Sequence, residues 1–200
     1  MKKLLSLLLA LIVLFLWGCS RKSTPQQKEN AISMYQEFLA GRRSLEDQNE
    51  KGEVNIDDIF IGDGWDRYAF FDVNGDGIPE LHIHRTAYYI LACEDDGLHI
   101  WGSFPSSSKL LSSGDILIER LPGAGYYVSY DFIDLDLDSN EQSRIEFARA
   151  MPHMLNDEPI FDESSKYWFE GKEVSMEEWN ILTEKYLSIA PAEIEWISVE

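Results

Sequence analysis

Short runs of strand-forming residues, separated by tight turns, recur through the middle of the chain and constrain its fold more than any other feature. The turn segments are rich in Gly, Asp, Asn, Ser and Pro and span only three or four residues each. Connections this short cannot carry a chain back for parallel pairing, so most neighbouring strands must pair antiparallel. The predicted strands are residues 67–72, 80–85, 87–93, 98–104, 115–121, 126–137, 143–149 and 166–169.

Helical patterns stand at the two ends of this strand region. Near the N-terminus, apolar residues recur at helical spacing, and Gly41 follows them as a C-cap. Near the C-terminus, Ser175 and Glu178 form a capping-box pattern that opens a second helix. The sequence therefore predicts an α+β fold, mainly an antiparallel β-sheet of about seven or eight strands, with one N-terminal and one C-terminal helix packed on it. The expected packing residues are Ile32, Tyr35, Phe38 and Leu39 in the first helix and Met176, Trp179, Leu182 and Tyr186 in the second.

The longest predicted strand changes its apolar face part-way along. Apolar residues occupy even positions up to Phe132 and odd positions from Ile133 onwards. Because strand side chains alternate between the two faces of a sheet, two structures are consistent with this pattern. A β-bulge near Phe132 and Ile133 would restore a single apolar face. Alternatively, both faces of the sheet are buried at that point.

The first 18 residues have the pattern of a secretory signal peptide. A basic start precedes an apolar run of 14 residues, from Leu4 to Trp17, which is shorter than the ~20 residues of a membrane-spanning helix. The end of this run resembles the lipobox of bacterial lipoproteins, and the resemblance implies that Cys19 is acylated, as with palmitate, and becomes the new N-terminus. Trp17 departs from the small residue usual there. An ordinary secretory signal is the alternative, and both place the domain outside the cytoplasm.

We expect residues 19–28 to be a flexible tether and residues 29–200 to form a single α+β domain. The segment after Cys19 is polar and cannot pack a core. The chain has 36 acidic against 17 basic residues, a formal charge of −19, which becomes −21 once the leader and its two lysines are removed. Such a surface repels phosphate backbones, so no nucleic acid is expected as a partner. Cys93 is expected to be a small apolar residue in a buried strand.

Chemistry is concentrated in residues 72–80, which read Asp-Val-Asn-Gly-Asp-Gly-Ile-Pro-Glu. Side-chain oxygens at alternate positions can converge on one cation when Gly77 adopts a positive φ. Calcium takes about six to eight hard oxygen ligands, whereas zinc prefers nitrogen or sulfur, which the loop lacks. The sequence therefore predicts one calcium ion, with water completing its shell. The expected ligands are Asp72, Asn74, Asp76 and Glu80 through their side chains and Ile78 through its carbonyl.

The loop starts like that of an EF-hand but differs from it further on. Its twelfth position, where an EF-hand has a bidentate Glu, is Ile83, and its eighth is Pro79. The flanking segments also have the pattern of strands rather than helices. The loop resembles the strand–loop–strand calcium site of integrin-type FG-GAP repeats, which have acidic or amide residues at the first, third, fifth and ninth positions. That resemblance covers about fifteen residues and implies the loop only, because the chain is too short for a propeller.

Simpler interpretations exist for the loop and for two nearby patterns. A solvated turn between two strands would explain the Gly and Asn residues of the loop, although not three carboxylates at ligand spacing. His82 and His84 share one strand face and could form a transition-metal pair, but no third ligand is evident, and we expect two exposed side chains. The acidic segment 134–140 alternates Asp with Leu and lacks a turning Gly, which is typical of a solvated strand face.

A wider resemblance spans most of the mature chain. Three motifs, from Tyr35 to Gly41, from Tyr68 to Leu81 and from Phe169 to Trp179, occur in the same order in uncharacterised surface lipoproteins of gut clostridia, to which the chain is similar. The resemblance implies a Gram-positive host and a lipid-anchored domain on the extracellular face of the cell membrane. That group has no established activity to transfer.

Three functional hypotheses follow. The first is a tethered binding or structural domain with a calcium-binding loop, whose partners are the lipid bilayer, through Cys19, and a cell-surface glycan or protein. The second is a glycan- or peptide-binding module, in which exposed aromatic rings stack on a ligand. The third is a cell-wall hydrolase, but we expect no enzyme because no catalytic motif is present. The candidate stacking residues are Trp65, Tyr88, Tyr89, Trp101, Tyr126 and Trp168, most of which are expected to pack in the core.

Overall fold

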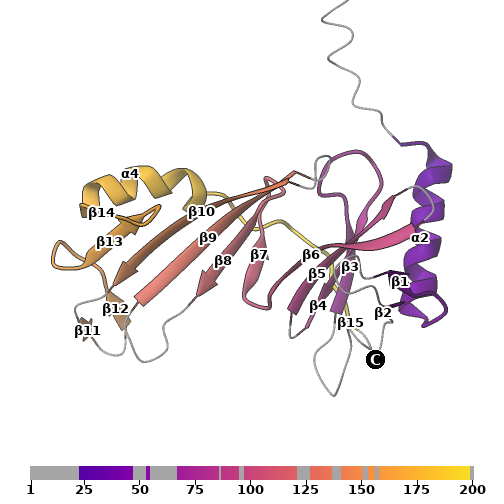
Figure 1. Cartoon of the computed structure of the whole chain (residues 1–200), viewed down its shortest axis with the longest axis horizontal. Coiled ribbons are helices and arrows are strands. Elements are labelled where there is room, and N and C mark those ends of the chain that lie inside the picture. Colours follow the sequence, from indigo (N-terminus) through magenta and orange to yellow (C-terminus); the bar gives the residue numbers. More distant parts are fainter. Residues whose placement is uncertain are drawn as a thin grey trace, which may run out of the picture.

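The computed structural model describes residues 23–46, 53–54, 67–85, 87–94, 97–120, 127–136, 141–150, 153–155 and 158–198. The expected signal peptide, Cys19, Trp65 and Tyr126 lie outside these residues. Figure 1 shows an elongated molecule with helix α2 at one end and helix α4 near the other. The described strands between them form two main sheets in which every strand pair is antiparallel, which confirms the α+β class and the antiparallel pairing.

A five-stranded sheet in the order β15-β3-β4-β5-β6 packs against helix α2 (Pro25–Leu39). Tyr35 and Phe38 on the helix form one core cluster with Leu81, Ile83 and Leu91 on the sheet. The opposite face of the sheet belongs to a second cluster, so the sheet is buried on both faces. Its strands are β3 (Arg67–Phe71), β4 (Glu80–His84), β5 (Ala87–Glu94), β6 (Gly97–Pro105) and β15 (Ile197–Ser198).

Helix α2 begins at Pro25, four residues before the predicted start of the domain. Thr24 is its N-cap: the N–H of Gln27 donates to the Thr24 hydroxyl at 3.3 Å, and the N–H of Thr24 donates to the Gln27 side chain at 2.8 Å. Proline suits the first helical position because the N–H it lacks would have no helical partner there. Residues 25–28 of the predicted tether are therefore helical, which corrects the boundary between tether and domain.

A six-stranded sheet in the order β14-β13-β10-β9-β8-β7 packs against helix α4 (Met176–Leu187). The helix begins after Ser175, whose hydroxyl accepts a hydrogen bond from the N–H of Glu178 at 3.1 Å, as predicted. Trp179 of the helix forms a third core cluster with Tyr130 and Phe147 of the sheet. The strands are β7 (Ser108–Leu110), β8 (Ile116–Arg120), β9 (Tyr127–Asp136), β10 (Glu141–Ala150), β13 (Lys166–Phe169) and β14 (Lys172–Val174).

The number of strands exceeds the prediction of about seven or eight. The two main sheets contain eleven strands, and two further two-stranded pairs are formed within the described residues. The strands that the sequence did not indicate are two or three residues long, too short to show an alternating pattern. One pair falls within residues 45–54, where the sequence predicts no strand. The additional pairs are β1 (Leu45–Glu46) with β2 (Glu53–Val54) and β11 (His153–Leu155) with β12 (Glu158–Ile160).

No bulge lies at Phe132 and Ile133. Strand β9 pairs in continuous register with β8 and with β10 through this point. Phe132 belongs to the cluster under α4, whereas Ile133 belongs to the cluster shared with the five-stranded sheet. The change of apolar face therefore reflects burial on both faces of the sheet, the alternative to a bulge. A register shift does occur elsewhere, between Ile90 and Leu91 in the β5–β6 pair.

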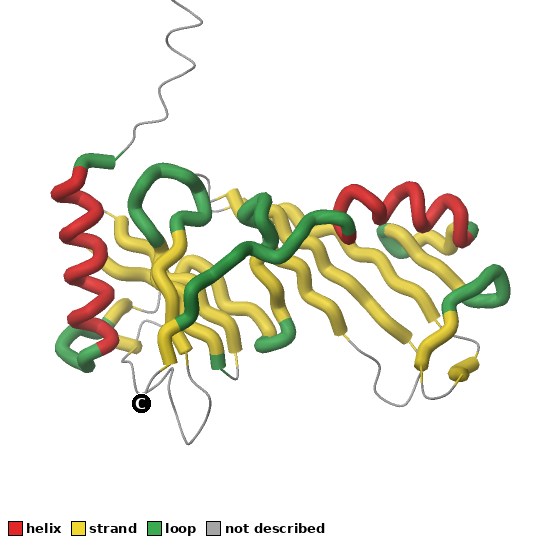
Figure 2. Tube along the Cα trace, turned by 180° about the vertical axis from the view of Figure 1, so that it is seen from behind, coloured by secondary structure: helices red, strands yellow, loops and turns green. Residues whose placement is uncertain are grey.

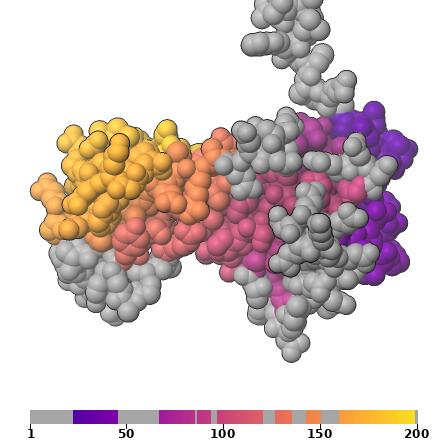
Figure 3. Space-filling view, in the orientation of Figure 1, coloured from indigo at the N-terminus to yellow at the C-terminus, as the bar shows by residue number. Residues whose placement is uncertain are grey.

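The segment after α4 returns across the molecule to the five-stranded sheet (Figure 2). The N–H of Ser112 donates to the carbonyl of Ala190 at 2.8 Å, and the N–H of Ala192 donates to the carbonyl of Leu110 at 2.9 Å. The described chain then reaches β15, which pairs with β3 as an edge strand of the five-stranded sheet. The space-filling view in Figure 3 shows the parts that carry the two sheets joined along the long axis.

Candidate metal site

The loop predicted to bind calcium, residues 72–80, connects β3 to β4 of the five-stranded sheet. Glu80 is the first residue of β4 and pairs with Phe71, the last residue of β3. Gly75 has a φ of 74° and Gly77 a φ of 92°, left-handed conformations that glycine adopts at little cost. The strand–loop–strand arrangement and the turn at Gly77 are therefore as predicted.

The polar side chains of the loop accept hydrogen bonds from the loop's own backbone. Asp72 accepts from two loop N–H groups, one on each carboxylate oxygen, at 2.7 and 2.9 Å. Asn74 Oδ1 and Asp76 Oδ1 each accept from the N–H two residues further on, at 2.9 and 2.6 Å. Each of these oxygens has a second lone pair. The arrangement thus fixes the side chains while leaving lone pairs to face a cation.

Glu80 closes the loop from the side of the sheet. Its Oε2 accepts a hydrogen bond from the N–H of Val73 at 2.8 Å, and the residue is only 4% exposed. The pKa of Glu80 is raised to about 7, chiefly because burial disfavours the charged form, and the charges of Asp72 and Asp76 act in the same direction. A divalent cation would favour the ionised form of all three carboxylates, because it would replace their mutual repulsion with attraction.

The segment that precedes α2 lies against this loop. The N–H and the hydroxyl of Ser23 both donate to the carbonyl oxygen of Asp76, each at 2.9 Å. An adjoining hollow of about 410 Å³ has Lys28 on the helix side and Asp72 on the loop side. Spacing in the sequence could not indicate this contact, because Ser23 and Asp76 are 53 residues apart.

The structure brings the four predicted side-chain ligands, Asp72, Asn74, Asp76 and Glu80, into one turn, and Ile78 follows Gly77 in the same turn. The side chain of Ile78 packs against the core cluster under α2. Across the described ranges, however, no group of three or more His, Cys, Asp or Glu side chains is arranged to hold a metal ion. The calcium site therefore stays a prediction.

The two histidines of β4 are not both exposed, contrary to expectation. His82 is completely buried: its Nδ1 lies 2.7 Å from the hydroxyl of Tyr88, and its Nε2 lies 3.3 Å from the carbonyl oxygen of Phe71. His84 is half-buried, with Nε2 2.9 Å from the carbonyl oxygen of Ser106. The exposed-face prediction failed because the five-stranded sheet is covered on both sides. Cys93 is partly buried against the cluster under α2, close to its expected environment.

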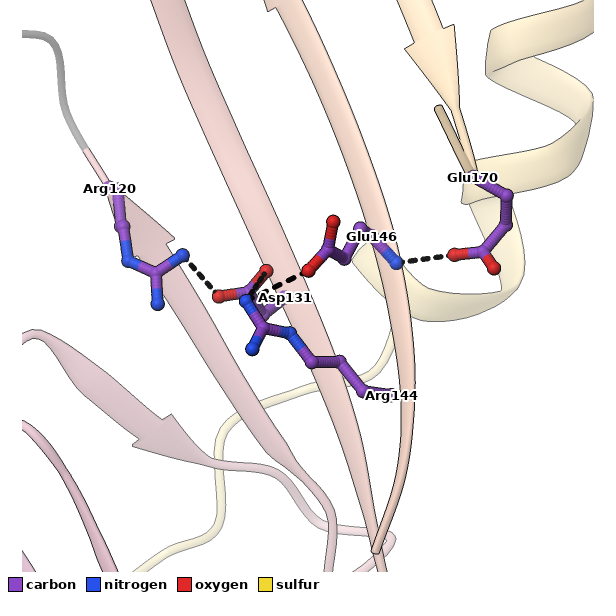
Figure 4. A network of polar contacts seen from close by, with 5 residues as sticks. All are labelled: Arg120, Asp131, Arg144, Glu146 and Glu170. Carbon is purple, nitrogen blue, oxygen red and sulfur yellow. Dashed lines mark hydrogen bonds and ion pairs between the residues drawn. The ribbon is translucent and has the colours of Figure 1, made fainter. Parts of the chain in front are cut away.

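A cluster of charged residues on the six-stranded sheet was not anticipated. This Asp131 cluster consists of Arg120 on β8, Asp131 on β9, and Arg144 and Glu146 on β10 (Figure 4). Arg144 Nη2 lies 2.9 Å from Asp131 Oδ1 and 2.9 Å from Glu146 Oε1, and Arg120 pairs with Asp131 Oδ2. The sequence places these charged residues in predicted strands, but their meeting depends on strand register, which alternation alone does not define.

Comparison of the chain with protein-family models, with curated proteins and with solved structures gave no match. A search of the described residues for a helix long and apolar enough to cross a membrane found none. A function must therefore be inferred from the loop, the surfaces and the sequence patterns of this chain.

Proposed function

We propose that this protein is a lipid-anchored domain on the extracellular face of a bacterial cell membrane, with one calcium ion bound by residues 72–80. Acylated Cys19 would attach the domain to the bilayer after removal of residues 1–18, as in the clostridial lipoproteins that the sequence resembles. One observation carries the calcium proposal. Asp72, Asp76 and Glu80 belong to one loop of nine residues in which each carboxylate accepts hydrogen bonds from the loop backbone, and Glu80 is buried there.

The donor set suits calcium in particular. The oxygens of Asp72, Asn74, Asp76 and Glu80, with the Ile78 carbonyl, are all hard ligands, and water would complete the shell. Extracellular calcium modules have dissociation constants of about 10⁻⁴ to 10⁻³ M, so occupancy outside a cell needs no tighter site. The ion would hold β3, β4 and, through Ser23, the start of α2 at one point. Its proposed role is therefore to stabilise the end of the domain that follows the anchor.

Calorimetry of the full chain in detergent, titrated with calcium, magnesium and zinc, tests the site. We expect calcium to bind with one ion per chain, and Asp76→Ala to weaken binding at least about tenfold because it removes a charged ligand. Asp134→Ala is the matched control, since it removes an exposed carboxylate outside the loop. Absence of calcium heat, or heat that Asp76→Ala leaves unchanged, would remove calcium from the proposal.

The anchor is tested in a Gram-positive host supplied with labelled palmitate. We expect the label on the wild-type chain and on Cys93→Ser, but not on Cys19→Ser, because acylation of a lipoprotein takes place on the cysteine at the end of its leader. Fractionation should place the labelled chain in the membrane. Equal labelling of Cys19→Ser and the wild type would contradict the proposal.

A further inference from the structure

The face of the six-stranded sheet opposite α4 has an open hollow of about 290 Å³. Tyr130 on β9 and Phe147 on β10 lie on the helix side, where both rings contact Trp179. Side chains alternate along a strand, so the neighbouring Asp131 and Glu146 project from the opposite face. Figure 4 shows the Asp131 cluster spread across three adjacent strands on this face.

The Asp131 cluster holds two guanidinium groups in place. The side chain of Asp131 is 3% exposed and pairs with both arginines, whereas Arg120 and Arg144 are 46% and 47% exposed. A guanidinium has five N–H donors in a rigid plane, more than these ion pairs use. The buried carboxylate of Asp131 therefore fixes the orientation of the N–H donors that Arg120 and Arg144 direct at the hollow.

The turn between β13 and β14 fixes the backbone of Glu146, a hydrogen-bond acceptor at the hollow. Glu170 in this turn has a φ of 51°, a conformation that residues with side chains rarely adopt. Its N–H donates to the carbonyl of Glu146 at 2.8 Å, and its carboxylate accepts from the N–H of Glu146 at 2.6 Å. Glu170 thereby positions the backbone of Glu146, whose own carboxylate is 61% exposed and available as an acceptor.

Two aromatic rings stand at the same hollow without belonging to any of the three core clusters of the described residues. Tyr127 is 46% exposed, and its ring centroid lies 5.7 Å from that of Trp168 on β13. Both residues line the hollow. Of the four stacking candidates that lie within the described residues, Tyr88 and Trp101 are buried, Tyr89 packs against the cluster under α2, and Trp168 alone lines this hollow.

The chemistry of the hollow selects among classes of ligand. Two arginines face Asp131 and Glu146, so the cluster has no surplus positive charge to attract an anion to a chain of charge −19. Addition of a peptide as a further strand needs a sheet edge, whereas β9 and β10 lie inside the sheet. A sugar has an apolar ring face that can stack on Tyr127 and Trp168, and hydroxyl groups that donate to carboxylates and accept from guanidinium groups.

We propose that this hollow binds a neutral oligosaccharide, with Tyr127 and Trp168 stacking on a sugar ring and with Arg120, Arg144 and Glu146 bonding its hydroxyl groups. A volume near the lower end of the ~300–1,000 Å³ range of ligand sites suits one or two sugar rings. The site is independent of calcium, because the loop 72–80 belongs to the other sheet.

Titration calorimetry and tryptophan fluorescence of the full chain test the site, in a detergent without a sugar headgroup. The probes are cellotetraose, maltotetraose and chitotetraose, with oligogalacturonate as the anionic comparison. At least one neutral probe should bind, and Tyr127→Ala and Trp168→Ala should each weaken it by about tenfold or more. Tyr127→Phe, which keeps the ring, should retain most of the affinity.

Two controls separate binding from folding and from calcium. Glu146→Gln removes an exposed charge and should weaken sugar binding without lowering the melting temperature. Ile181→Ala, on the outer side of α4, should change neither the sugar affinity nor the melting temperature. Binding should persist in a chelator, so this test succeeds or fails separately from the calcium proposal. Absence of binding by all neutral probes at millimolar concentration, binding by oligogalacturonate alone, or affinity that Tyr127→Ala and Trp168→Ala leave unchanged would overturn the proposal.

Discussion

Ser23 donates two hydrogen bonds, from its N–H and its hydroxyl, to the single carbonyl oxygen of Asp76. The start of the described chain is therefore bound to the middle of the loop proposed for calcium. Gly77, the next residue of the loop, leaves room for this contact: a Cβ added there would lie 2.8 Å from the hydroxyl oxygen of Ser23. The contact links the segment that precedes α2 to the conformation of the loop.

Gly77→Ala should destabilise the protein more than Gly75→Ala. Both glycines have positive φ, which costs about 1–2 kcal/mol for alanine. A Cβ at Gly75 would meet nothing within 4 Å, whereas one at Gly77 would displace the hydroxyl of Ser23, at a further cost of about 1 kcal/mol. Urea denaturation measures both differences. Ser23→Ala should lower the free energy of unfolding by less in the Gly77→Ala protein than in the wild type. An equal decrease in both proteins would contradict this interpretation.

The buried His82 predicts a loss of stability in acid. Burial lowers the pKa of His82 from 6.5 to about 4 in the folded state. Its stabilising contribution is thus fully present above pH 6.5 and is lost as the pH falls towards 4, by about 3 kcal/mol in all. When the free energy of unfolding is measured from pH 7 to pH 4, the wild type should show this decrease and His82→Gln should not. Glu80 titrates with the opposite sign but is common to both proteins, so it cancels in the difference.

Tyr88→Phe is the matched control for His82. It removes the hydroxyl 2.7 Å from His82 Nδ1 while keeping the ring that covers the imidazole. Because burial is the cause of the lowered pKa, this variant should keep the acid-induced loss of stability. A pH dependence that disappears in Tyr88→Phe would assign the effect to the hydrogen bond instead.

Helix α4 is expected to be attached to its sheet mainly by Trp179. This ring is 2% exposed, and its centroid lies 5.6 Å from that of Tyr167 and 6.1 Å from that of Phe147. Trp179→Ala should cost about 3–5 kcal/mol of unfolding free energy. Ile181→Ala, at a residue 67% exposed on the same helix, should change stability by less than about 0.5 kcal/mol. Similar effects of the two variants would mean that α4 contributes little to the core.

The predictable part of the fold consists of elements long enough to show a period. Each of the eight predicted strands corresponds to a strand of the structure, and both helices were identified from their apolar faces. The unpredicted strands, such as β7 and β14, have three residues each, too few to show an alternating pattern, although each pairs with a strand close to it in the sequence. Alternation also failed for His82, because it cannot distinguish a solvated face from one covered by another part of the chain.

The same limit applies to the two sites. The strand–loop–strand turn proposed for calcium could be identified from the sequence because its candidate oxygens lie within nine consecutive residues. The Asp131 cluster could not, because Arg120, Asp131 and Arg144 come from three strands whose register depends on tertiary packing. The meeting of Tyr127 with Trp168 has the same origin, since β10 lies between their strands.

Trp196 attaches the C-terminal tail to the five-stranded sheet. Its ring packs edge-on to those of His84 and Tyr88, at centroid distances of 5.8 and 6.3 Å, and the guanidinium of Arg67 lies 4.6 Å from its centroid. Upstream, Ala190 and Ala192 are hydrogen-bonded to Ser112 and Leu110, at the end of β7 in the six-stranded sheet. Loss of the Trp196 ring should therefore weaken the attachment of β15 to β3.

Native-state hydrogen exchange of Trp196→Ala measures how far the effect of this attachment extends. We expect amides of β3 and β4 to exchange faster while those of β9 and β10 keep their protection, because the six-stranded sheet retains its own core under α4. Glu195→Ala, at the exposed neighbouring residue, is the control and should leave both sheets unchanged. Equal acceleration in both sheets would show that they unfold only together, and the tail would then be part of one cooperative unit rather than a separable connection.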